Sequence, residues 1–323
     1  AANDGDTVHL LEGDFVERID LTNKQITLKG TTDPKTGEHL SRIIPEVSGT
    51  DIYGAIKLWT TPCTIQDLVI TGVYEGNGEA AGGLHCYNSA STFNNCIFES
   101  CEGYYGAAYI YGYATTVPSF NNCQFLGNHA SYTGGSIFLK YTGSPIGAMP
   151  LTNCIFENNT AQYTAGIALS YVSSSYAYKV GLDLSLCTFI NNVKQNEGSP
   201  VGHSINGVRQ TTTSIYGTTF CGLEGQLTVN GQYSDTYVDD GFNGITTDCT
   251  DSDNDLRPND LDQCVGIDDD LNDIGWADCA EEENEDGSWT YYVKAGTQIA
   301  PAIHIANDGD TVHLLEGDFV ERI

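Results

Sequence analysis

The segment FNNCIFES at 93–100 recurs along the chain as FNNCQFLG at 120–127, LTNCIFEN at 151–158 and LSLCTFIN at 184–191. Two further segments fit the same frame, IQDLVITG at 65–72 and IYGTTFCG at 215–222. Leu68 and Thr218 stand there at the cysteine position, and successive equivalent positions from Leu68 to Thr218 are 28, 27, 31, 33 and 31 residues apart. A period near 30 residues is typical of a solenoid, in which each coil contacts only its neighbours.

A second, glycine-containing motif alternates with the first: GGLHC at 82–86, GAAYIY at 106–111, GGSIFL at 134–139, AGIALS at 165–170 and VGHSIN at 201–206. Each period therefore holds several short runs of alternating apolar and polar residues, separated by Gly, Asn or Ser. This alternation predicts β-strands with one buried face. The chain is predicted to be all-β, a parallel β-helix (a solenoid) followed by an acidic, loop-rich linker.

Stacking of such coils would place equivalent side chains directly above one another, about 4.8 Å apart. One predicted interior column is a cysteine ladder of Cys96, Cys123, Cys154 and Cys187. A second column consists of phenylalanines: Phe98, Phe125, Phe156, Phe189 and Phe220. Asparagines are expected to stack at a turn: Asn94, Asn95, Asn121, Asn122 and Asn153. Because buried free cysteine behaves as a small apolar residue, we expect a structural role for this ladder rather than metal binding or catalysis.

Residues 2–19, ANDGDTVHLLEGDFVERI, recur unchanged at 306–323, an offset of 304 residues. Packing alone would not preserve surface positions such as His9 and His313, so the identity indicates a 304-residue unit that recurs in tandem. An artificial duplication of the ends is the alternative. The segment TYYVKAGTQIAPAIHI at 290–305 leads into the second copy in the manner of an opening strand. We interpret the chain as one period plus an overlap.

Two features resemble known families. Joined from Ile305 and continued through 6–30, the sequence IANDGDTVHLLEGDFVERIDLTNKQITLKG resembles the first coil of pectin-lyase-like right-handed parallel β-helices. The F-x-x-N-x-A elements, FLGNHA at 125–130 and FENNTA at 156–161, resemble the repeats of bacterial polymorphic outer-membrane proteins. The resemblance covers about residues 1–235 and implies a right-handed solenoid. It implies no single activity, because this scaffold serves lyases, hydrolases, esterases, adhesins and passive spacers.

The composition changes abruptly after residue 247. Between Asp248 and Asp286 there are 16 acidic residues and one basic residue, so this stretch carries half of the formal charge of −30. A chain of this charge is repelled by nucleic acid and by anionic membranes, and it attracts cations. No run of 18 apolar residues is present, so we expect no insertion into a membrane.

Part of the acidic stretch, DSDNDLRPNDLDQC at 251–264, is similar to a thrombospondin type 3 calcium repeat. Oxygen ligands at alternate positions let one loop wrap a hard cation. The resemblance implies Ca²⁺ as a cofactor, with these ligands: Asp251, Asp253, Asp255, Asn259 and Asp262. Leu256 departs from the family, which prefers glycine there, and DDDLND at 268–273 is a poorer match. A solvated linker without calcium is the alternative.

Four cysteines outside the interior ladder are candidates for disulfides: Cys221, Cys249, Cys264 and Cys279. One arrangement pairs Cys221 with Cys249 and Cys264 with Cys279, although connectivity does not follow from sequence. Disulfides would staple a segment that has no core of its own. Together with a calcium site, they predict an extracellular or cell-surface location.

Candidates for catalysis are sparse. Glu99 and Glu157 occupy equivalent positions, but Leu126 lies on the coil between them, which separates the two carboxylates by roughly 10 Å. Other titratable residues have no spacing that converges on these glutamates: Lys140, Lys179, His85, His129 and His203. No serine-hydrolase, zinc-protease or nucleotide-binding motif is present. We expect a protein that is not an enzyme; a secreted polysaccharide lyase or hydrolase is the alternative.

A cluster of tyrosines supplies a further alternative: Tyr104, Tyr105, Tyr109, Tyr111 and Tyr113. Alternating rings such as Tyr109 and Tyr111 can pack against a neighbouring subunit or stack on the apolar faces of sugars. The first possibility predicts an assembly face, and the second a carbohydrate-binding adhesin module that contacts surface glycans.

The sequence predicts three parts: a parallel β-helix over 1–247, an acidic linker over 248–288, and over 289–323 the opening strand and first coil of the next repeat. The expected function is mechanical, as a repeat unit of a bacterial extracellular fibre, stalk or adhesin shaft. The expected partners are identical repeat units, joined covalently or by self-assembly.

Overall fold

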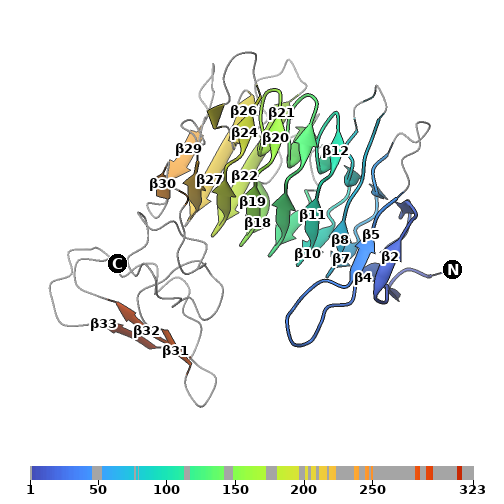
Figure 1. The fold of residues 1–323 in the computed structure, drawn as a ribbon, viewed down its shortest axis with the longest axis horizontal. Coiled ribbons are helices and arrows are strands. Elements are labelled where there is room, and N and C mark those ends of the chain that lie inside the picture. Colours follow the sequence, from blue (N-terminus) through green and yellow to red (C-terminus); the bar gives the residue numbers. More distant parts are fainter. Residues whose placement is uncertain are drawn as a thin grey trace.

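The computed structural model describes residues 2–45, 53–75, 78, 80–112, 117–141, 148–171, 180–195, 201–202, 205–208, 211–216, 218–222, 236–239, 244–246, 249, 281–283, 289–293 and 311–314. Throughout these ranges the regular structure is β-strand, and no helix occurs among them. Figure 1 shows the strands succeeding one another in chain order along the long axis of the molecule.

Four sheets run along this axis. The first consists of β1 (Thr7–His9), β4 (Thr27–Lys29), β7 (Thr64–Gln66), β10 (Thr92–Asn94), β14 (Ser119–Asn121), β18 (Ala148–Thr152), β22 (Val180–Ser185), β27 (Thr211–Tyr216) and β29 (Thr236–Asp239). The second consists of β2 (Gly13–Phe15), β5 (Ser41–Ile43), β8 (Val69–Ile70), β11 (Ile97–Glu99), β15 (Gln124–Leu126), β19 (Ile155–Glu157), β23 (Thr188–Ile190), β28 (Thr219–Cys221) and β30 (Gly244–Thr246).

The other two sheets complete the cross-section. The third consists of β3 (Ile19–Asp20), β6 (Ile56–Trp59), β9 (Leu84–Tyr87), β13 (Ala108–Gly112), β17 (Ile137–Tyr141), β21 (Ile167–Tyr171) and β26 (Ile205–Val208). The fourth consists of β12 (Glu102–Gly103), β16 (His129–Ala130), β20 (Thr160–Ala161), β24 (Val193–Lys194) and β25 (Val201–Gly202).

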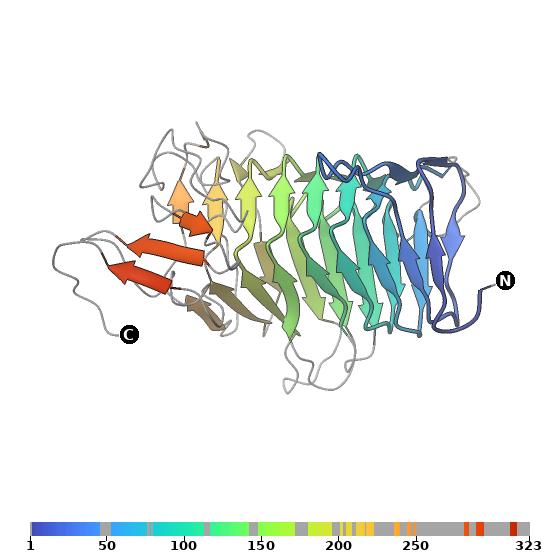
Figure 2. The same cartoon turned by 90° about the horizontal axis from the view of Figure 1, so that it is seen from below.

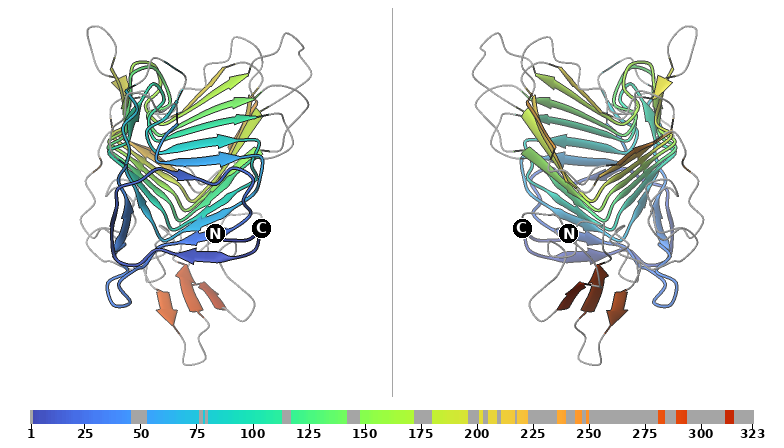
Figure 3. Two further views of the ribbon diagram at one scale, coloured as in Figure 1. Left: turned by 90° about the vertical axis from the view of Figure 1, so that its right-hand side faces the viewer. Right: turned by 90° about the vertical axis from the view of Figure 1, so that its left-hand side faces the viewer.

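Every pairing in the first three sheets is parallel and joins strands of successive coils; in the fourth sheet, β24 and β25 pair antiparallel. A chain that visits the sheets in turn and returns to the first sheet one position further along forms a parallel β-solenoid. Figures 2 and 3 show the coils from the side and from the two ends. The predicted all-β parallel solenoid is confirmed, and the predicted repeat of about 30 residues corresponds to one coil.

The solenoid interior is built from columns of apolar side chains in register. Along the second sheet one column runs through eight coils: Phe15, Ile43, Ile70, Phe98, Phe125, Phe156, Phe189 and Phe220. Neighbouring rings lie parallel, with Phe156 4.9 Å from Phe125 and 4.4 Å from Phe189 between centroids. Phe156 has no exposed surface, whereas Phe15, at the end of the column, is half-buried. The column is therefore shielded from solvent at Phe156 and partly exposed at its first coil.

Asparagines occupy the turn between the first and second sheets. Asn95, Asn122 and Asn153 have left-handed backbones with φ of 49–52°, a conformation that asparagine tolerates better than most residues. Their side-chain amides bond between coils, as in the 3.1 Å bond from Asn153 Nδ2 to Asn122 Oδ1. A neighbouring 3.0 Å bond joins Asn121 Nδ2 to Asn94 Oδ1.

A second asparagine ladder, Asn128–Asn159–Asn192, is fully buried. Asn159 Nδ2 donates to Phe125 O at 2.8 Å and to Asn192 Oδ1 at 2.9 Å. Its Oδ1 accepts from the backbone N–H of Asn128 at 3.0 Å and from Asn128 Nδ2 at 2.9 Å. The F-x-x-N-x-A element thus supplies a stacked ring, a buried amide ladder and, at Ala130 and Ala161, a small buried residue.

The glycine motif marks a place where successive coils approach closely. A Cβ atom on Gly106 would lie 1.8 Å from the carbonyl oxygen of Gly135, and one on Gly135 would lie 2.2 Å from that of Ala165. Any larger residue at either position would therefore push the coils apart.

A separate three-stranded sheet is formed by β31 (Glu281–Glu283), β32 (Trp289–Val293) and β33 (Thr311–Leu314). β31 pairs antiparallel with β32, and β32 pairs parallel with β33. β33 belongs to the second copy of the duplicated segment and corresponds to β1. In Figures 1 and 2 this sheet lies beside the last coils, at the end of the molecule away from the N-terminus.

Candidate functional site

Aromatic and basic side chains gather on the outer face of the third sheet. In β6, Ile56 and Leu58 are buried in the core, so the alternate residues Lys57 and Trp59 point away from it. The strand register aligns the outward residues of four coils in two columns. The first is Trp59, Tyr87, Tyr111 and Lys140, and the second is Lys57, His85, Tyr109 and Phe138. We call these eight residues the aromatic face.

The first column is a continuous, half-buried ladder of rings with a cation near each end. Ring centroids are 4.2 Å apart between Trp59 and Tyr87, and 5.3 Å apart between Tyr87 and Tyr111. The Nζ of Lys57 lies 5.6 Å from the Trp59 ring, and the Nζ of Lys140 lies 5.9 Å from the Tyr111 ring. Both contacts are within the range of cation–π attraction.

The second column lies beside the first, and its three ring residues are buried. His85, Tyr109 and Phe138 are 7%, 4% and 5% exposed, and Tyr105 stacks on Phe138 at 3.9 Å. Tyr109 is therefore covered by Tyr105 and Phe138, whereas the Tyr111 ring is half-buried. The alternation in the sequence predicts the same environment for these two tyrosines.

A second row of rings is the most exposed. Tyr104 stacks on Tyr132 with centroids 4.9 Å apart, and Tyr132 meets Tyr163 edge-on at 5.1 Å. Tyr132 is 38% exposed and Tyr163 is 44% exposed. Exposed rings held in rows about one coil apart can stack on apolar sugar faces or pack against a protein surface.

His85, in the second column of the aromatic face, has a strongly lowered pKa. Burial, and then the nearby charge of Lys57, lower the pKa of His85 to about 4. Its Nδ1 is buried and has no hydrogen-bond partner among the described residues. The ring packs edge-on against Tyr53 at 4.8 Å and Tyr109 at 5.1 Å. His85 is therefore neutral at pH 7 and behaves as part of the aromatic packing.

This lowered pKa predicts acid destabilisation. Unfolding restores the ordinary pKa near 6.5, so below that pH the unfolded chain binds a proton that the folded chain does not. The contribution of His85 to the free energy of unfolding should be unchanged above pH 6.5, fall by about 2 kcal/mol by pH 5, and level off near pH 4.

Urea unfolding of the native chain and of His85→Phe at pH 7.5 and pH 5 measures the effect. Because phenylalanine keeps the ring contacts but does not titrate, the variant should gain about 2 kcal/mol relative to the native chain on going to pH 5. An equal loss of stability in both proteins would rule out His85 as the source.

The four ladder cysteines Cys96, Cys123, Cys154 and Cys187 have no exposed surface and are free thiols. Their sulfurs contact carbonyl oxygens of the preceding coil, as Cys154 Sγ does Phe120 O at 3.5 Å. Burial raises the pKa of Cys96 and Cys154, and it raises the pKa of Cys86 and Cys101 to about 12. Buried thiols whose pKa is raised, as in Cys96 and Cys154, are poor nucleophiles and poor metal ligands.

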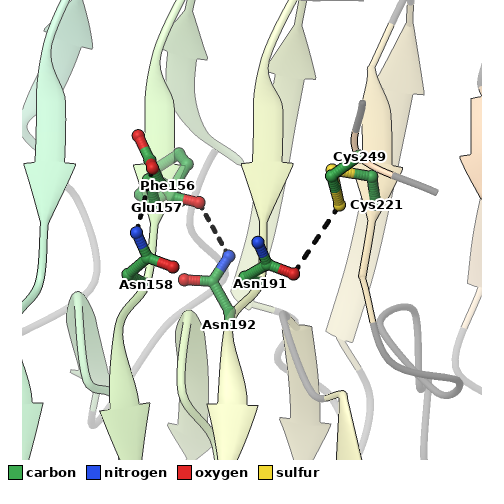
Figure 4. The surroundings of a disulfide bond; sticks show 7 residues. All are labelled: Phe156, Glu157, Asn158, Asn191, Asn192, Cys221 and Cys249. Carbon is green, nitrogen blue, oxygen red and sulfur yellow. Dashed lines mark hydrogen bonds between the residues drawn. A yellow bond between two sulfur atoms is a disulfide. The ribbon is translucent and has the colours of Figure 1, made fainter. Parts of the chain in front are cut away.

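Of the four disulfide candidates, Cys221 and Cys249 are bonded to each other. Cys221 ends β28, and the bond ties residue 249 to this late coil (Figure 4). The sulfur of Cys249 lies 3.6 Å from Asn191 Oδ1, and the backbone N–H of Asn191 donates to Cys221 O at 3.0 Å. Cys264 and Cys279 lie outside the described residues.

Glu99 and Glu157 are separated as expected, with Leu126 in register between them. Glu99 is instead paired with Arg42 at 2.5 Å, and Arg42 also lies 3.8 Å from Asp14. The sequence did not reveal this pair, because Arg42 and Glu99 are 57 residues apart.

Several predicted site residues lie outside the described residues. They include all five proposed calcium ligands, Asp251, Asp253, Asp255, Asn259 and Asp262, the weaker segment 268–273, and Tyr113, Lys179 and His203. In the described part of the chain, no group of three or more His, Cys, Asp or Glu side chains is placed to hold a metal ion. The same residues contain no helix long and apolar enough to cross a membrane.

Comparisons with protein-family models, curated proteins and solved structures found no match to this chain.

Proposed function

We propose that this chain is a structural repeat unit of a bacterial extracellular or cell-surface fibre, stalk or adhesin shaft. One observation carries the proposal. The 18 residues that open the solenoid recur at 306–323, and there their strand, β33, already pairs in parallel with β32. A sequence that begins one solenoid is thus joined to a strand that follows another, which is the connection that an end-to-end array requires.

The spacing of strands supports the same interpretation. Paired residues of β32 and β33 are 21 residues apart (Thr290 and Thr311), and those of β1 and β4 are 20 apart (Thr7 and Thr27). Both intervals correspond to one short coil. Residues 289–314 therefore have the length of a coil that precedes the duplicated segment in a continuing solenoid.

The unit is proposed to act mechanically and without catalysis. Each coil satisfies the backbone hydrogen bonds of its neighbours, so force along the axis is shared among many parallel strands. The Cys221–Cys249 disulfide supports an extracellular location, because such bonds persist in oxidising compartments. The proposed right-handed pectin-lyase-like relationship rests on the first-coil resemblance.

Sedimentation of native material tests this function. We expect elongated particles heavier than the 34.8 kDa of one chain. A compact species of one chain at every concentration would contradict the proposal.

Calcium is proposed to neutralise and stiffen the acidic linker between units. The donor set of Asp251, Asp253, Asp255, Asn259 and Asp262 supplies the hard oxygen ligands that Ca²⁺ prefers. Without the ion, a stretch of charge −15 would repel itself and extend.

EDTA is therefore expected to make the particles flexible or to dissociate them, and excess Ca²⁺ should reverse the change. Persistence length in electron micrographs is the measurement. Asp253→Asn with Asp255→Asn should reproduce the EDTA effect in Ca²⁺. Rods that are unchanged in EDTA would contradict a structural role for calcium.

A carbohydrate-binding adhesin module is the second candidate, and the half-buried ladder of Trp59, Tyr87 and Tyr111 favours it. Glycan-array binding that is lost in Trp59→Ala but kept in Tyr163→Ala would support a sugar site on the aromatic face. Absence of glycan binding by the native chain would favour the alternative, in which the aromatic face packs against a protein.

A polysaccharide lyase or hydrolase is the third possibility. The cluster of Asp14, Arg42 and Glu99 is the combination of carboxylates with a basic residue that such an enzyme would use. Cleavage of pectin-type polymers that is lost in Glu99→Gln would favour it, and intact polymers would count against it.

A further inference from the structure

We propose that the open edge of β1 binds the strand 289–293 of a second copy of this chain, adding it as a parallel strand to the first sheet. The inference deepens the function proposed above and rests on it. It identifies the partner segment and the residues that it meets.

The acceptor is an edge strand. β1 is the first strand of its sheet and pairs on one side with β4; in the described part of the chain no strand pairs with its other edge. Backbone groups along such an edge are free to pair with an added strand. The core is also incomplete here, because Val8 and Leu10 pack against it but remain only half-buried.

The donor is identified by the chain itself. β33 has the same sequence as the β1 region, and the structure pairs it with β32 in a defined register: Thr290 with Thr311, Tyr291 with Val312, Tyr292 with His313 and Val293 with Leu314. Subtracting the 304-residue offset transfers this register to β1. Thr290 then meets Thr7, Tyr291 meets Val8, Tyr292 meets His9 and Val293 meets Leu10.

The edge that the donor would take is the correct one. In the first and second sheets the strands are stacked in chain order, so each strand has the preceding coil on one edge and the following coil on the other. β32 precedes β33 by one coil, as β1 precedes β4. The strand equivalent to β32 therefore belongs on the edge of β1 opposite β4, which is the open one.

The side-chain pattern also suits this place. Residues in register on neighbouring parallel strands face the same side of a sheet. Tyr291 and Val293 would thus continue the columns of Val8 and Leu10 and cover the half-buried end of the core. Thr290 and Tyr292 would follow Thr7 and His9, which are exposed.

The same residues imply competition within the chain. The donor strand is already paired with β33, so a second chain gains it only when β33 releases it. β33 is therefore a cap in cis, and weakening it should favour pairing between chains.

Cysteine crosslinking of full-length chains tests the register. A Thr290→Cys chain is mixed with a Thr7→Cys chain, since paired residues on adjacent strands lie about 4.8 Å apart, within the roughly 4.4–6.8 Å that a disulfide spans. We expect a reducible heterodimer crosslinked between positions 290 and 7. Its yield should be at least about tenfold higher than with a Val8→Cys chain, where the sulfur would lie on the opposite face.

Two further variants make the result decisive. Thr290→Cys combined with Thr311→Cys in one chain should form an intrachain disulfide that holds the donor strand against β33 and abolishes the heterodimer. Formation of this intrachain bond would show that the register permits a disulfide. Val312→Pro, combined with Thr290→Cys, should release the donor and raise the heterodimer yield.

No heterodimer from the Val312→Pro chain, or equal crosslinking to Thr7→Cys and Val8→Cys, would overturn strand donation. Fibres without the register-specific crosslink would leave the proposed function standing and refute this inference. The crosslink without fibres would do the reverse.

Discussion

Replacement of Asn159 by leucine is expected to lower the free energy of unfolding by about 2–6 kcal/mol. Asn159 connects three coils, because it accepts two bonds from Asn128 and donates to Asn192 and to the carbonyl of Phe125. Leucine has a similar volume but none of these polar atoms. The backbone N–H of Asn128 and the carbonyl of Phe125 would lose these buried bonds, at a cost of roughly 1–3 kcal/mol for each group, whereas Asn128 Nδ2 keeps its bond to Phe98 O.

Urea unfolding at pH 7.5 measures this loss. Asn158→Gly is the matched control, since Asn158 is exposed and has a left-handed φ of 54° that glycine adopts freely. We expect the control to stay within about 0.5 kcal/mol of the native chain. A loss below about 1 kcal/mol for Asn159→Leu would mean that the ladder contributes little to the fold.

Replacement of Phe156 by alanine is expected to cost about 3–5 kcal/mol. Its ring is fully buried between Phe125 and Phe189, so the cavity would interrupt the column at both neighbouring interfaces. Phe15→Ala removes the same side chain from the same column at its half-buried end, and it should cost clearly less. Equal costs for the two variants would contradict the column as the main source of cohesion. Chemical denaturation provides the comparison.

The sequence predicted those features of the fold that repeat. The Phe column and the buried cysteine series follow from periodicity, because one coil per period places equivalent residues above one another. The turn asparagines follow for the same reason, and their left-handed backbones explain why asparagine recurs there.

The remaining features depend on side-chain contacts that cannot be predicted from the sequence period. The buried ladder through Asn159 lies within the F-x-x-N-x-A motif. This motif indicated a family resemblance, but it did not predict the hydrogen bonds that the asparagine makes. Tyr109 and Tyr111 alternate with equal regularity, yet Tyr105 and Phe138 cover the first and leave the second half-buried. The Arg42–Glu99 pair joins residues 57 positions apart, across coils whose lengths vary.

The duplicated segment shows how the two kinds of information combine. Sequence identity alone relates residues 2–19 to 306–323 but says nothing about what lies beside them. The pairing of β32 with β33 supplies that neighbour, and the identity then transfers it to β1.

Electron microscopy of native material in Ca²⁺ tests the central claim, end-to-end assembly, most directly. We expect unbranched rods of constant width, whose axial repeat equals the length of one solenoid with its linker and whose lengths are multiples of that repeat. Isolated particles of one unit in Ca²⁺ at every concentration, with no axial repeat, would contradict it.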